Sequence, residues 1–81
     1  MTLTFQSVRV ATEYDEEGML VFNGNRRLVA VLTRLSEQNE IAPGQWFLEA
    51  GFGRLGGISH PTFANLETAQ VWINQRLVHQ N

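Results

Sequence analysis

Apolar runs separated by short polar segments divide this chain into four expected strands and one expected helix. The first strand alternates with a change of phase, because Leu3 and Phe5 share one parity whereas Val8 and Val10 share the other. A strand with a period of two residues cannot bury all four on one face without a slip. We therefore predict a bulge or bend near Gln6–Ser7.

Two turn signals flank the second apolar run, Met19–Phe22. The polar stretch Tyr14–Gly18 precedes it and closes on a glycine, which is typical of a hairpin loop. Asn23-Gly24 follows it, and Asn-Gly between two apolar runs is a strong hairpin signal because both residues tolerate a positive φ. The sequence therefore predicts that the first three strands are joined by two successive hairpins.

The third expected strand, residues 27–35, is apolar on both of its sides. These sides carry Leu28, Ala30 and Leu32, and Val29, Val31 and Thr33, respectively. Such a strand is typically central and covered, at least partly, on both faces. The turn dipeptide Pro43-Gly44 lies in the polar connection that follows, and the fourth strand is expected to begin at Trp46.

An amphipathic helix is expected from Leu66 to Val78. Asn65 suits the N-cap, and Glu67 falls in the first turn, where it complements the helix dipole. One apolar stripe, about 80° wide, contains Leu66, Ala69, Ile73 and Leu77. A single stripe places the helix across one sheet face. The predicted fold is α+β: a four-stranded antiparallel meander (β-β-β-β-α) packed against one C-terminal helix.

Length and composition narrow the class of protein. The 81 residues suit one small domain over residues 1–81, and the absence of cysteine removes disulfides, thiolate zinc sites and cysteine nucleophiles. The N-terminus lacks the basic and apolar regions of a signal peptide, and no apolar run approaches the roughly 20 residues that span a bilayer. We expect a cytoplasmic protein with no membrane partner.

Charge is mildly negative overall but segregated along the chain. Six arginines, no lysine and eight acidic residues give a net charge of −2. Four of the acids lie within Glu13–Glu17, whereas Arg26, Arg27 and Arg34 follow with no acid between Gly18 and Leu35. A negative net charge counts against strong non-specific binding of nucleic acid, which depends on phosphate neutralisation.

The segment Gly51–Gly56 matches the dinucleotide-binding pattern G-x-G-x-x-G and follows an expected strand. That fingerprint requires a helix opening at the third glycine, so that its N-terminus holds the pyrophosphate. Here Pro61 intervenes, and only a few residues follow the helix, which leaves no room for the parallel strand of a βαβ unit. We therefore interpret the glycines as turn chemistry and expect no cofactor.

Catalytic and metal-binding constellations are not evident. His60 and His79 are the only histidines, and neither has a carboxylate at an organised ligand or triad spacing. The acidic run Glu13–Glu17 lacks the alternating ligand pattern of an EF-hand and suits a solvated hairpin tip. We expect no catalytic residues, no metal and no enzyme activity.

The leading functional hypothesis is a small non-enzymatic interaction module that binds a protein partner or itself. Val71 and Val78 lie about 20° apart on a helix side away from the core stripe, and Trp72 flanks that stripe. If exposed, they form a contact surface. The alternative is that the N-terminal strand or the loop after Gly56 covers them.

The second hypothesis is nucleic-acid binding through Arg27, Arg34, Arg54 and Trp46, since arginine and aromatic side chains on a sheet face pair with phosphates and stack on bases. The strands, glycine turn and Leu-Glu-Thr-Ala-Gln-Val-Trp-Ile helix resemble domains of the AP2 and phage-integrase arm-binding type over roughly residues 27–77. That resemblance implies DNA reading by the face opposite the helix. The chain departs from it in being acidic, lysine-free and one strand longer.

Overall fold

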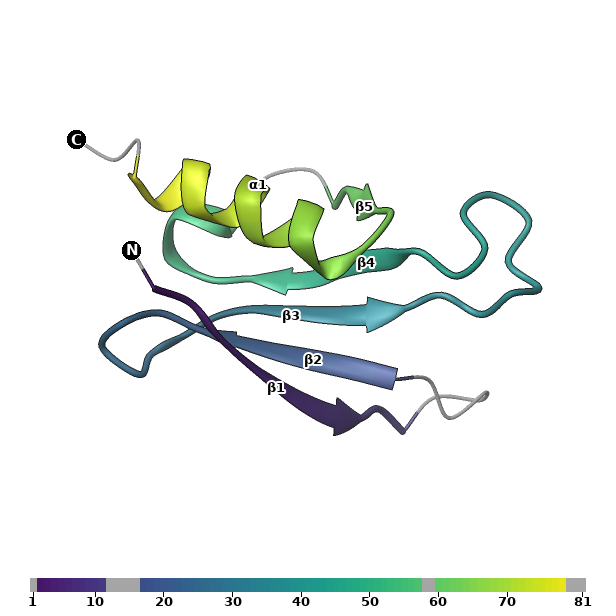
Figure 1. The fold of residues 1–81 in the computed structure, drawn as a ribbon, viewed down its shortest axis with the longest axis horizontal. Helices are drawn as coiled ribbons and strands as arrows, with labels where there is room; N and C mark the ends of the chain where they lie inside the picture. Colours follow the sequence, from purple (N-terminus) through teal and green to yellow (C-terminus); the bar gives the residue numbers. More distant parts are fainter. Residues whose placement is uncertain (1, 12–16, 58–59, 79–81) are drawn as a thin grey trace.

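The computed structural model of this chain describes residues 2–11, 17–57 and 60–78, apart from the side chain of Val78. It is a five-stranded antiparallel sheet whose strand order follows the chain, with one C-terminal helix (Figure 1). The elements are β1 Thr4–Arg9, β2 Glu17–Phe22, β3 Leu28–Arg34, β4 Trp46–Gly51, the 3-10 turn η1 Gly53–Leu55, β5 Thr62–Phe63 and α1 Leu66–Val78. The predicted α+β class is confirmed, and β5 is an additional two-residue strand.

The first strand differs from the prediction. Its pairing with β2 is continuous from Thr4 to Arg9, so the predicted bulge at Gln6–Ser7 is wrong. The change of phase instead places apolar residues on both faces of β1. Val8 and the following Val10 reach over Gly18, where an added Cβ would meet their methyl groups.

The turn between β2 and β3 is a hairpin, as predicted, but its positive φ lies elsewhere. Asn23 Oδ1 accepts hydrogen bonds from the backbone N–H of Asn25 (2.9 Å) and Arg27 (3.1 Å). The left-handed residue is Arg26, with φ 62°, rather than Asn23 or Gly24, whose tolerance of a positive φ was the basis of the hairpin prediction. A three-residue loop that ends in a left-handed residue is a common hairpin connection and explains the shift.

The helix begins and ends where the sequence predicts, at Leu66 and Val78. The N-cap side chain, Asn65 Oδ1, accepts hydrogen bonds from Thr68 N–H (2.8 Å) and Thr68 Oγ1–H (2.9 Å). No helix among the described residues is long and apolar enough to cross a membrane.

The core lies between α1 and one face of the sheet. Ala69 and Ile73 on the helix are fully buried, as are Leu32 on β3 and Leu48 on β4. The remaining core members are Leu3, Val21, Val29, Ala30, Trp46, Leu55 and Phe63. Since cross-strand neighbours share a face, the pairs Met19–Leu32 and Leu32–Leu48 define the face that α1 covers.

Candidate functional site

The sheet face opposite α1 carries apolar side chains that no described helix covers, although the His60 ring stacks on one of them, Phe47. Val31 pairs with Leu20 on one side and Ala50 on the other, and Phe22 pairs with Leu28 in the next row. The register places these residues, together with Phe47, on one face, and all six are half-buried. We call this surface the open face and define it by Leu20, Phe22, Leu28, Val31, Phe47 and Ala50.

The open face continues into the connection between β3 and β4. An apolar hollow of about 230 Å³ lies there, and Leu35, Ile41 and Phe47 contribute to its lining. Ile41 itself is 94% exposed. It is held in place because Asn39 Oδ1 accepts hydrogen bonds from the backbone N–H of Ile41 (2.9 Å) and Ala42 (2.8 Å). A protruding apolar side chain therefore stands directly beside an apolar recess.

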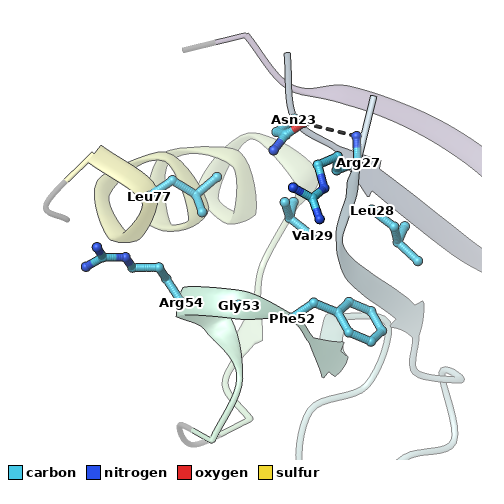
Figure 2. Close-up of a pocket in the computed structure, with 8 residues that line it drawn as sticks. All are labelled: Asn23, Arg27, Leu28, Val29, Phe52, Gly53, Arg54 and Leu77. Carbon is cyan, nitrogen blue, oxygen red and sulfur yellow. Dashed lines mark hydrogen bonds between the residues drawn. The ribbon is translucent and has the colours of Figure 1, made fainter. Parts of the chain in front are cut away.

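A second surface forms at the end of the sheet that holds the β2–β3 turn. Antiparallel pairing brings the end of β4 to this turn, since Phe52 N–H donates to the Val29 carbonyl (3.0 Å). Arg27 from the turn and Arg54 from η1 consequently line one hollow of about 410 Å³, together with Leu77 of α1 (Figure 2). These two arginines belong to the predicted nucleic-acid set, and the structure brings them together.

The other two members of that predicted set lie elsewhere. Arg34, at the opposite end of the sheet, forms ion pairs with Glu17 (3.4 Å) and Glu37 (3.5 Å), and its Nε–H donates to the Gly44 carbonyl (3.3 Å). Trp46 is only 8% exposed and belongs to the core. Neither residue is therefore available beside Arg27 and Arg54.

The helix side that was expected to contact a partner contains one exposed valine. Val71 is 56% exposed, whereas the side chain of Val78 lies outside the described part of the chain. Trp72 is half-buried against Phe63, with ring centroids 5.5 Å apart, and the Arg76 guanidinium lies 4.7 Å from the Trp72 ring centroid. Isolated exposed valines are ordinary on protein surfaces. Among the described side chains, this side of α1 therefore supplies less apolar surface than the open face.

The glycine-rich segment forms a turn that leads into β5. Gly53 and Gly57 have positive φ values of 59° and 75°. Gly51 lies so close to Leu55 that an added Cβ would meet the Leu55 carbonyl group. The helix begins only at Leu66, so its N-terminus is not at the third glycine of the G-x-G-x-x-G match.

His60 connects this segment to β4. Its Nδ1–H donates to the Leu48 carbonyl (2.6 Å), and its ring stacks on Phe47 with centroids 5.9 Å apart. Within the described residues, no group of three or more histidine and acidic side chains is placed to hold a metal ion. His79 and Glu13–Glu16 lie outside that part of the chain. The contacts of His60 are those of a residue that holds a loop against a strand.

Comparisons with protein-family models, curated proteins and solved structures find no match to this chain. Function is therefore inferred from the open face and from the hollow that Arg27 and Arg54 line. Ile41 was not predicted from the sequence to be a surface contact residue. The phase change in β1 and the apolar composition of both sides of β3 are the sequence signals that could have indicated the open face, but they had been interpreted as a bulge and as a strand covered on both faces.

Proposed function

We propose that this protein is a small non-enzymatic interaction module that associates with a second copy of itself through the open face. The observation that carries this proposal is the row Leu20–Val31–Ala50, which is apolar and half-buried on a face without a second layer. Sheets bury an apolar face against another element. In this chain, the described elements cover only the opposite face.

The protruding Ile41 and its neighbouring hollow favour a second copy as the occupant. A two-fold dimer requires each surface patch to be complementary to itself, so a projection and a recess must both lie on the same patch. Ile41 stands beside the apolar hollow lined by Leu35 and Phe47. A two-fold axis close to this loop would place the Ile41 of each copy in the hollow of the other.

The size of the surface predicts a weak and reversible dimer. Four strands of about six residues form a face of roughly 20 Å by 20 Å, or about 400 Å² per copy. Two such faces bury about 800 Å², and the Ile41 contacts add to this area, which remains at the low end of specific interfaces. We expect a dissociation constant on the order of 100 µM.

Analytical ultracentrifugation over a concentration series tests the proposal. The wild-type protein is expected to shift from monomer to dimer, and Ile41→Asp is expected to weaken the dimer about tenfold or more by placing a carboxylate in the apolar hollow. Leu20→Thr, which preserves strand propensity, is expected to weaken it several-fold. Val71→Asp is the matched control, because Val71 is also an exposed apolar residue but lies on α1.

A monomer at every concentration up to about 1 mM would overturn the proposal, because that range extends tenfold above the expected dissociation constant. A loss of association in Val71→Asp but not in Ile41→Asp would show that the interface lies on the side of α1 that carries Val71, as the sequence suggested. The cytoplasmic location stays a prediction from the sequence.

A further inference from the structure

We propose that the end of the molecule opposite the Arg34 ion pairs binds single-stranded nucleic acid, in a groove formed by Arg26, Arg27, Arg54 and Arg76. We call these four residues the arginine end. This groove shares Leu28 with the open face but lies at the other end of the sheet from the proposed dimer contact at Ile41, and it is not the face that the AP2-type resemblance implied. It therefore constitutes a second function of the same small domain.

The four guanidinium groups of the arginine end have no acidic partners in the described structure. The acidic side chains Glu17 and Glu37 lie at the far end of the sheet, where both form ion pairs with Arg34. No carboxylate lines the hollows in which the four arginines lie. A chain with a net charge of −2 thus presents a local concentration of positive charge to a polyanion.

Three neighbouring hollows lie at this end. The first, about 550 Å³, is lined by Arg26 and Asn23, and the second, about 410 Å³, by Asn23, Arg27 and Arg54. The third, about 430 Å³, is lined by Arg54 and Arg76. Asn23 and Arg54 each line two of the hollows, so the three are neighbours at the β2–β3 turn, η1 and the end of α1. A series of neighbouring hollows lined by arginines suits successive phosphates of an extended chain.

Aromatic side chains favour a single strand over a duplex. Phe52 lines the middle hollow and is 47% exposed, which leaves much of its ring available. Figure 2 shows Arg27 and Phe52 on adjacent segments of the chain, with the Phe52 ring pointing toward the side of Leu28 and away from Arg54. Trp72 lines the third hollow, but its ring packs against Phe63 and lies under the Arg76 guanidinium, so Phe52 is the ring that remains open to a base. Unstacked bases stack on such rings while arginines neutralise the neighbouring phosphates, whereas the bases of a duplex are already stacked on one another.

Fluorescence anisotropy with a labelled oligo(dT) of 12 nucleotides tests this proposal, at protein concentrations at which ultracentrifugation shows a monomer. If all four arginines neutralise phosphates, the slope of log K against log salt is about −3, which corresponds to a roughly 50-fold loss between 50 and 200 mM salt. Arg27→Gln and Arg54→Gln are each expected to weaken binding about fivefold and to reduce the slope by about 0.7.

Arg34→Gln is the matched control, because it removes the same charge from the far end of the sheet, and it is expected to leave affinity unchanged apart from a small general effect. Phe52→Leu tests stacking and is expected to lose several-fold in affinity for oligo(dT) but nothing for inorganic polyphosphate. Circular dichroism establishes that each variant is folded.

Three results would overturn the proposal. They are no detectable complex at 50 mM salt, an effect of Arg34→Gln equal to that of Arg27→Gln, and binding of a duplex at least as tight as binding of oligo(dT). If Phe52→Leu bound oligo(dT) as tightly as the wild type, no base would stack on Phe52, and the ligand would be a simple polyanion and not a nucleic acid. The monomeric Ile41→Asp variant is expected to bind as the wild type does, so failure of dimerisation and failure of this binding are separate outcomes.

Discussion

The two faces of the sheet have similar apolar residues but different surroundings. Leu32 and Val31 are neighbours on β3, yet Leu32 is fully buried beneath α1 whereas Val31 is half-buried on the open face. A single helix is about 10 Å wide and spans about two strands, whereas five strands extend over roughly 25 Å. One helix therefore completes a core on part of one face only. An apolar strand residue is consequently no proof of a core position.

The largest expected effect comes from truncating the two neighbours on β3. Leu32→Ala removes a buried side chain and leaves a cavity, so we expect the free energy of unfolding to fall by about 3 kcal/mol. Val31→Ala removes a smaller, half-buried side chain and is expected to cost about 1 kcal/mol or less. Urea denaturation of the monomer measures both.

Equal losses in Leu32→Ala and Val31→Ala would contradict the distinction between the faces. A larger loss in Val31→Ala at high protein concentration than at low concentration would instead support the proposed dimer, because association stabilises the folded state.

An intermediate effect is expected where β4 ends. Gly51→Ala would place a Cβ against the Leu55 carbonyl, and Leu55 is part of the core, so the backbone must shift. We expect a loss of about 2 kcal/mol in the free energy of unfolding. Gly24→Ala is the matched control. The nearest atom to an added Cβ at Gly24 is the Thr2 carbonyl oxygen, 4.0 Å away, and φ is not positive there. An equal loss in both variants would show that the close approach at Gly51 is not the cause.

A smaller effect is expected at the N-cap of α1, the helix that covers one face of the sheet and leaves the other open. Asn65→Ala removes the acceptor for Thr68 N–H, and we expect a loss of about 1 kcal/mol. Asn65→Asp retains an acceptor and adds a favourable charge near the helix N-terminus, so it is expected to match the wild type. Thermal unfolding followed by circular dichroism measures both variants. Equal destabilisation by alanine and aspartate would exclude capping as the source of the loss.

Local patterns predicted those parts of the fold that depend on neighbours in the sequence. The helix bounds followed from the stripe that includes Ala69 and Ile73, and from the capping side chain of Asn65. The start of β4 at Trp46 followed from the Pro43-Gly44 turn. The two-residue strand β5 was not predicted, because Thr62–Phe63 is too short to display a period and forms by pairing with Trp46–Phe47.

The functional surfaces were only partly predictable. Arg27 and Arg54 were chosen as arginines next to aromatic residues, together with Arg34 and Trp46. The structure separates this set because Arg27 precedes the start of β3 whereas Arg34 is its last residue, so the two arginines lie at opposite ends of the sheet. At its own end, Arg34 forms an ion pair with Glu37. Charge spacing along a sequence does not reveal such pairings, because the acidic partners depend on which loops fold to the same end.

The sequence by itself determined the α+β class, the antiparallel pairing of β1 with β2 and of β2 with β3, and the single C-terminal helix. These features depend on periodicity and turn chemistry over a few residues. Tertiary structure alone decided which apolar face α1 covers, and so why Leu32 is core while Val31 is surface. It also decided that Arg27 and Arg54, distant in sequence, line one hollow. Both outcomes depend on strand register and on the limited width of one helix. Neither can be predicted from a short stretch of sequence, because each depends on residues that are distant along the chain.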